Sequence, residues 1–98
     1  MPMFNEGTIV HHLRYNYRGV VVKVDATCQA SETWYGKNRT QPERGQPWYH
    51  VLVDGGQETY VAESNLELDT EGEPVSHPAV SQVFPTFLNG KYYRQNLN

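Results

Sequence analysis

The stretch QPWYHVLVDGG, residues 46–56, sets the architecture of the chain. Its β-branched and aromatic residues favour a strand, and the Asp-Gly pair that follows is typical of a hairpin turn. Side chains alternate across a strand, so Trp48, His50 and Leu52 share one face and Tyr49, Val51 and Val53 share the other. Both faces are bulky, so both need a cover. For the second face the candidates are the chain's own long polar segment, its C-terminal segment and another copy of the protein.

The rest of the pattern is mainly β. Short strands separated by frequent turn signals predict a small sandwich or barrel of about five strands with little helix. In the strand VVVKV we expect Val20, Val22 and Val24 to share the core face. The further strands are expected at residues 8–12, 48–53 and 58–63.

Two segments fall outside the strand pattern. Residues 26–46 are polar and contain Gly and Pro, which predicts one long loop, with a short helical turn beginning at Ser31. The tail has Val80, Val83, Phe84 and later apolar residues at near-helical spacing, so a short helix or turn is expected to pack on the barrel. We expect a single domain over 1–98, with a core over about 4–88 and a C-terminal tail at 89–98.

Composition limits the classes of function. The 98 residues include a single cysteine, Cys28, and no apolar run approaches the roughly 20 residues of a membrane span. The start has no basic region followed by an apolar one, so a cytoplasmic protein is expected. Residues 1–50 hold six Lys/Arg and four Asp/Glu, whereas residues 51–98 hold two and seven. A net charge of -3 argues against nucleic acid as a main partner, although one local basic face remains open: Arg14, Arg18, Lys23, Arg39 and Arg44.

No catalytic or metal site emerges from the sequence. The histidines His11, His12, His50 and His77 lack metal-ligand spacing, and a structural or polar-pairing role is expected for each. Cys28 has no accompanying motif for thiol catalysis. The acidic run between Asp54 and Glu73 lacks the spacing of a calcium loop and is expected to be a solvated face. We therefore expect no enzyme and no cofactor.

Aromatic residues supply the sharper hypothesis. They are core and barrel rim in one interpretation, and an exposed surface for a peptide or a base in the other. Trp34 and Tyr35 are expected to be exposed, and Trp48 to be buried. Arg18 and Glu63 are candidates for an ion pair that closes the barrel. The candidate binding patch consists of Trp34, Tyr35, Trp48, His50, Tyr60 and Glu63.

Five segments together resemble a known family. They are YRGVVVKVD (17–25), SETWY (31–35), QPWYHVLVDG (46–55), TYVAESNLE (59–67) and GEPVSHPAV (72–80). In order and spacing, over about residues 4–88, they resemble the HspQ/YccV-like family, also called the hemimethylated DNA-binding domain. The resemblance implies a small SH3-like β-barrel. It also implies a heat-shock protein that binds hemimethylated DNA, and a link to the Lon protease as substrate and specificity factor.

Two binding hypotheses follow. A reader of hemimethylated DNA predicts that the basic residues cluster and that affinity falls steeply with salt, with an aromatic such as Trp34 sensing the methyl group. A protein-interaction module, acting as an adaptor for the Lon protease or its substrates, predicts an exposed aromatic patch and modest salt dependence. In that case a free sheet edge can take up a peptide as an added strand.

Overall fold

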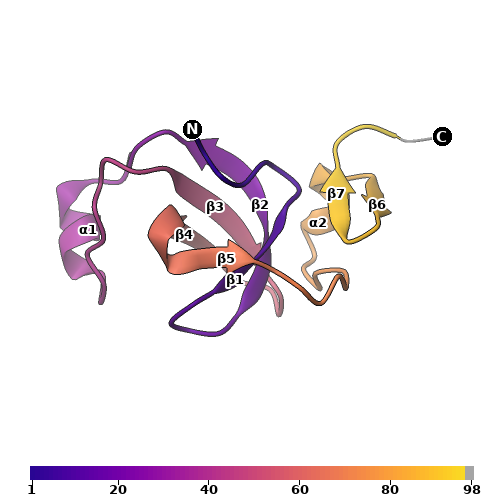
Figure 1. Cartoon of the computed structure of the whole chain (residues 1–98), viewed down its shortest axis with the longest axis horizontal. Helices are drawn as coiled ribbons and strands as arrows, with labels where there is room; N and C mark the ends of the chain where they lie inside the picture. The colour runs from indigo at the N-terminus through magenta and orange to yellow at the C-terminus, as the bar shows by residue number, and fades with distance from the viewer. Residues whose placement is uncertain (97–98) are drawn as a thin grey trace.

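The computed structural model describes residues 1–96 and is mainly β, as predicted (Figure 1). The strands are β1 (Ile9–His12), β2 (Arg18–Asp25), β3 (Trp48–Val53), β4 (Glu58–Ala62), β5 (Leu66–Leu68), β6 (Thr86–Leu88) and β7 (Lys91–Tyr93). The first five form an antiparallel sheet with the order β4-β3-β2-β1-β5, and a separate hairpin pairs β6 with β7. The helices are short: α1 (Glu32–Lys37), the 3-10 helix η1 (Glu63–Asn65) and α2 (Val80–Val83).

The five-stranded sheet is open, so the predicted closed barrel is not confirmed. β4 and β5 follow one another in the chain and are joined by η1, yet each lies at an edge of the sheet. β4 pairs with β3, and β5 pairs with β1. Each edge therefore keeps one row of backbone groups that is not used by the sheet.

The two faces of β3 are covered by different parts of the chain. Tyr49, Val51 and Val53 point into a core that also contains Phe4 and Val61. On the opposite face, the segment over residues 26–46 covers Trp48, and the C-terminal segment covers Leu52. Two of the three candidate covers are thus used together, one at each end of the strand.

A β-bulge in β2 overturns the predicted face of its valines. The register with β3 pairs Val21 with Val51 but Lys23 with His50, so Val22 is an extra residue. Val20 and Val22 pack in the core beside the C-terminal segment, whereas Val24 packs in the core on the other face. The expectation that Val20, Val22 and Val24 share one face is therefore wrong, because it assumed unbroken alternation.

The long segment over residues 26–46 folds back on the sheet. As predicted, a helix begins beside Ser31, whose hydroxyl caps it by accepting a hydrogen bond from the Trp34 amide at 3.1 Å. The Cys28 amide donates to the carbonyl of Arg44 at 2.8 Å, which closes the base of the segment. These contacts hold Trp34 against Trp48, the first residue of β3.

The C-terminal segment is folded beyond the predicted core. α2 lies where the apolar spacing indicated a short helix, and β6 then pairs in a hairpin with β7, which lies in the segment expected to be a tail. Tyr92 is buried, and its amide donates to the carbonyl of Gly7 at 2.9 Å. Gly7 has a φ of 92°, and a Cβ at this position would overlap the Tyr92 carbonyl, so only glycine fits here. Within residues 1–96 there is no helix of the length and apolarity that a membrane crossing requires.

Candidate binding groove

A groove runs beside β4, at one edge of the sheet. Its volume is about 740 Å³, and all five residues of β4 line it. Two further parts of the chain bound it. The α1 wall consists of Trp34, Asn38 and Arg39, and the turn wall consists of His12, Tyr15 and Tyr17.

β4 lies between the two walls. The Tyr17 hydroxyl and the Thr59 hydroxyl are hydrogen-bonded at 2.9 Å. The next residue, Tyr60, lies against Trp34 with the ring centroids 5.6 Å apart. Successive side chains of a strand point to opposite faces, so the turn wall flanks one face of β4 and the α1 wall flanks the other.

Aromatic packing fixes the α1 wall. Trp48 lies beneath Trp34 and Tyr60, with centroids 6.1 and 5.3 Å away, and its indole N–H donates to the Glu43 carbonyl at 3.2 Å. Trp48 is 1% exposed and supports the wall from below. Trp34 and Tyr60 are half-buried and present their outer faces to the groove. The structure thus brings together these three members of the predicted patch.

His50 and Tyr60 share an acceptor that the sequence analysis did not single out. Asp25 Oδ2 accepts from the Tyr60 hydroxyl at 2.7 Å and lies 3.1 Å from His50 Nε2. Burial raises the pKa of Tyr60 to about 12, and the hydrogen bond to Asp25 adds to this effect. Burial also acts to raise the pKa of Asp25, but the hydrogen bonds from Tyr60 and His50 outweigh it and lower that pKa. The Tyr60 phenol that lines the groove is therefore neutral and donates to the charged Asp25 carboxylate, which is not itself a lining group.

His12 anchors the turn wall. Its Nδ1 accepts hydrogen bonds from the amides of Arg14 and Tyr15 at 3.1 and 3.0 Å, and its ring lies between those of Tyr15 and Tyr17. Burial lowers the pKa of His12, so the acceptor nitrogen stays unprotonated at neutral pH. The Arg14 guanidinium lies 5.7 Å from the centre of the Tyr15 ring.

Tyr35 and Glu63, the other two members of the predicted patch, make hydrogen bonds within the fold. The Tyr35 hydroxyl donates to the Pro42 carbonyl at 2.7 Å. Glu63 Oε2 accepts from the Tyr49 hydroxyl at 2.6 Å and from the Met3 amide at 2.9 Å. The expected ion pair between Arg18 and Glu63 is wrong, because Glu63 ties the N-terminal segment to the core.

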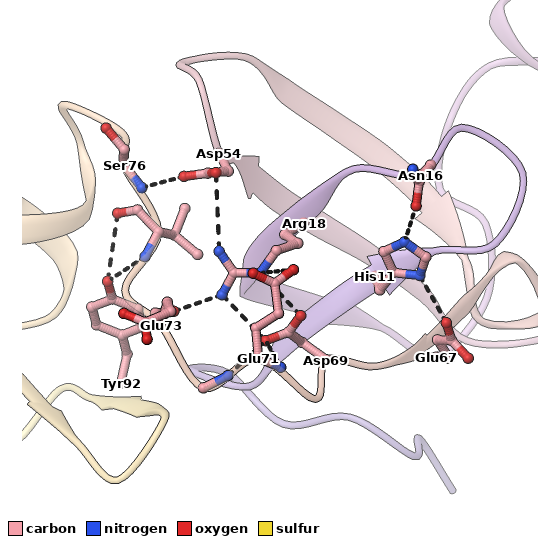
Figure 2. A network of polar contacts seen from close by, with 12 residues as sticks. His11, Asn16, Arg18, Asp54, Glu67, Asp69, Glu71, Glu73, Ser76 and Tyr92 are labelled. Carbon is pink, nitrogen blue, oxygen red and sulfur yellow. Dashed lines mark hydrogen bonds and ion pairs between the residues drawn. The ribbon is translucent and has the colours of Figure 1, made fainter.

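Arg18 is held in an acidic cage at the other end of β3 (Figure 2). Its guanidinium donates to both carboxylate oxygens of Asp69, at 3.0 and 3.2 Å, and to the backbone carbonyl of Glu73 at 2.6 Å. Glu71 and Asp54 lie 3.5 and 4.0 Å away. The hydrogen bond to Asp69 raises the pKa of Arg18. Burial acts to raise the pKa of Asp69, but the hydrogen bonds from Arg18 and from the amides of Gly72 and Glu71 outweigh it and lower that pKa. Arg18 is thus committed to the fold.

The other predicted DNA contacts do not form one cluster. Arg44 donates to the Ala30 carbonyl at 2.6 Å and lies over the Tyr35 ring, so it fastens the long segment. Lys23 is exposed on β2, opposite His50 in the register. Arg39 lines the groove directly, and Arg14 adjoins it through Tyr15. One of the five basic candidates, Arg39, therefore lines the groove, and a second, Arg14, lies beside it.

Comparison with known proteins identifies the family. The family model described as "Hemimethylated DNA-binding protein YccV like" matches residues 2–91. The chain belongs to this family. The match covers the five-stranded sheet, both walls of the groove and the first residue of β7.

Curated relatives carry the same segment within longer proteins. F-box only protein 21 of Homo sapiens is 36% identical over 92 residues, which cover 91% of this chain and 15% of that protein. The Pongo abelii protein of the same name is also 36% identical, and that of Mus musculus is 35% identical, with the same coverage. The chain thus spans about 15% of the length of these relatives.

Proposed function

We propose that this chain is a non-enzymatic binding module that recognises hemimethylated DNA through the groove beside β4. The family description supplies the ligand. The single observation that carries the choice of surface is that Arg39 and two half-buried rings, Trp34 and Tyr60, line the same groove.

These groups suit the chemistry of a methylated duplex. An arginine neutralises a phosphate, and an aromatic face makes apolar contact with a methyl group or stacks on a base. Trp34 is proposed as the methyl-sensing residue, with Arg39 and Arg14 as phosphate contacts. The acidic cage around Arg18 follows the end of β3, whereas Trp48 begins that strand, so a duplex at the groove lies away from this cluster of carboxylates.

The test is a titration of intrinsic tryptophan fluorescence against matched unmethylated, hemimethylated and fully methylated GATC duplexes at two salt concentrations. Binding should be tightest to the hemimethylated duplex and should weaken with salt. Arg39→Gln should weaken binding and reduce the salt slope by about one. Lys37→Gln is the matched control, because Lys37 lies on the same segment but does not line the groove. Weak binding that ignores methylation would overturn the proposal.

A second candidate function is protein binding, as an adaptor for the Lon protease or its substrates in protein quality control. The net charge of -3 favours it over nucleic acid. The observation specific to the fold is the unpaired edge of β4, which lies in the groove. Pull-down of purified Lon by the immobilised chain tests this candidate, and failure to retain Lon at low salt would count against it.

A further inference from the structure

We propose that the groove receives an extended segment of a partner polypeptide, which pairs with the free edge of β4 as an additional strand. The segment carries apolar side chains and at least one acidic side chain. This inference rests on the protein-binding candidate above and defines the chemistry of the partner. It does not depend on DNA binding.

The register of the β3–β4 hairpin identifies the free backbone groups. Val53 donates to the Gln57 carbonyl at 2.7 Å, and Glu63 donates to the Pro47 carbonyl at 2.9 Å. In an antiparallel ladder, hydrogen-bonded and non-hydrogen-bonded pairs alternate. The residues of β4 that bond to β3 are therefore Thr59 and Val61. The N–H and C=O groups that point away from β3 belong to Glu58, Tyr60 and Ala62.

Both sides of an added strand would find a surface. Side chains of a bound extended peptide alternate between the two faces of the sheet. One set would contact the α1 wall at Trp34, and the other would contact the turn wall at Tyr15 and Tyr17. Backbone pairing supplies affinity in this mode, and the pockets for alternate side chains supply specificity.

The charge of the groove selects the partner. Among the described residues that line the groove, Glu58 is the only one with a carboxylate, whereas Arg39 lines the α1 wall and Arg14 adjoins the turn wall through Tyr15. Within residues 1–96, Arg39 is exposed and has no ion pair. An acidic side chain on the peptide would complement these two arginines. The groove thus favours an acidic ligand although the chain as a whole has a net charge of -3.

The experiment uses a synthetic peptide, Ac-Thr-Phe-Asp-Val-Asp-Phe-Thr-NH₂, and the whole chain labelled with ¹⁵N. Peptide binding should protect the amides of Glu58 and Tyr60 from hydrogen exchange by about tenfold or more. The same peptide N-methylated at alternate amides is the control, because it keeps the side chains and loses backbone donors. If both peptides bind equally well, strand addition is wrong.

A matched pair of variants tests the edge from the protein side. Glu58→Pro removes an outward N–H at the exposed start of an edge strand, where proline is tolerated, and Glu58→Ala removes the same carboxylate but keeps the N–H. Relative to Glu58→Ala, Glu58→Pro should weaken peptide binding about tenfold. Equal affinity of the two variants, with equal thermal stability, contradicts the proposal. If Glu58→Pro does not fold, the comparison of the unmodified and N-methylated peptides, both measured on the wild-type chain, tests strand addition instead.

Parallel titration with the hemimethylated duplex separates this inference from the DNA proposal. Duplex binding without peptide binding overturns the strand-addition proposal and leaves the DNA proposal intact. Peptide binding without duplex binding overturns the DNA proposal and supports strand addition. If the Glu58 and Tyr60 amides are protected in the peptide-free protein and this protection grows with protein concentration, the occupant is a second copy of the chain, and the partner-peptide proposal is wrong.

Discussion

Trp34 lies edge-on against Tyr60, with ring centroids 5.6 Å apart and ring planes at 63°. This contact joins the long segment over residues 26–46 to the edge strand of the sheet. It makes one wall of the groove continuous with β4. A loop that is polar in sequence thereby contributes an aromatic surface beside free backbone groups.

Removing the Trp34 ring should abolish binding at the groove while the fold persists. Trp34→Ala should cost about 2 kcal/mol of stability, less than a fully buried aromatic truncation, because Trp34 is only half-buried. Calorimetry of ligand binding, with thermal unfolding in parallel, measures both effects. Tyr35→Phe is the control, since Tyr35 does not line the groove. Unchanged affinity for both duplex and peptide in Trp34→Ala would place the binding surface elsewhere.

The acidic cage around Arg18 should be a major contributor to stability. Asp69→Asn leaves the buried guanidinium without its bidentate partner, and we expect a loss of about 3–5 kcal/mol in the free energy of unfolding. Glu71→Gln should cost less than about 1 kcal/mol, because the Glu71 side chain is 62% exposed. Urea unfolding of the two variants measures the difference. Equal losses would show that Asp69 has no special role.

The adjacent histidines should give opposite pH dependences. Burial lowers the pKa of His12 below its ordinary value of 6.5. The unfolded chain therefore takes up this proton first, and the stability from His12 is present above pH 6.5 and lost as pH falls through the folded-state pKa. Hydrogen bonds to Asn16 and Glu67 raise the pKa of His11, so its contribution is present below pH 6.5 and lost as pH rises through the folded-state pKa.

His12→Asn is the informative variant, because the amide oxygen can accept the two backbone hydrogen bonds and does not titrate. Between about pH 7 and about pH 5 this variant should lose less stability than the wild type. His11→Asn should change the slope in the opposite direction. Unfolding free energies at several pH values test this, and a parallel profile for all three proteins would contradict it.

The Tyr60 hydroxyl should control the ionisation of Asp25. Tyr60→Phe removes a hydrogen bond that lowers the pKa of Asp25, so this pKa should rise. A carboxyl group whose pKa is lowered by folding stabilises the fold at pH values above 3.8, its pKa in the unfolded chain. This stability is lost as the pH falls through the folded-state pKa. On acidification, Tyr60→Phe should therefore unfold at a higher pH than the wild type. NMR titration of the Asp25 carboxyl carbon measures the shift. An unchanged pKa would mean that His50 alone controls Asp25.

Local patterns in the sequence predicted the hairpin, the Ser31 helix and the burial of Trp48, because each depends on neighbouring residues. The bulge at Val22 was missed, since nothing in VVVKV marks the position where alternation breaks. Hairpin β6–β7 was missed because its strands are three residues long and the burial of Tyr92 includes contacts far along the chain, such as those with Ile9 and Gly7.

The site was predicted in part for the same reason. Trp34, Trp48, His50 and Tyr60 were named as aromatic and polar candidates, and the structure brings them together. Asp25 was not among the predicted site residues, because its hydrogen bond with Tyr60 depends on the shifted register of β2 against β3. The expected Arg18–Glu63 pair was based on opposite charge alone. In the fold, Arg18 binds Asp69 and Glu63 accepts a hydrogen bond from Tyr49.

The most direct test of the groove as the binding surface is a ¹H–¹⁵N NMR titration of the whole chain with a hemimethylated GATC duplex at low salt. The largest chemical-shift changes should fall on the Trp34 indole, Arg39 and the amides of β4, with little change at the C-terminal hairpin β6–β7. Changes centred on Lys91 and Arg94, or no changes in the groove at saturating duplex, would contradict it.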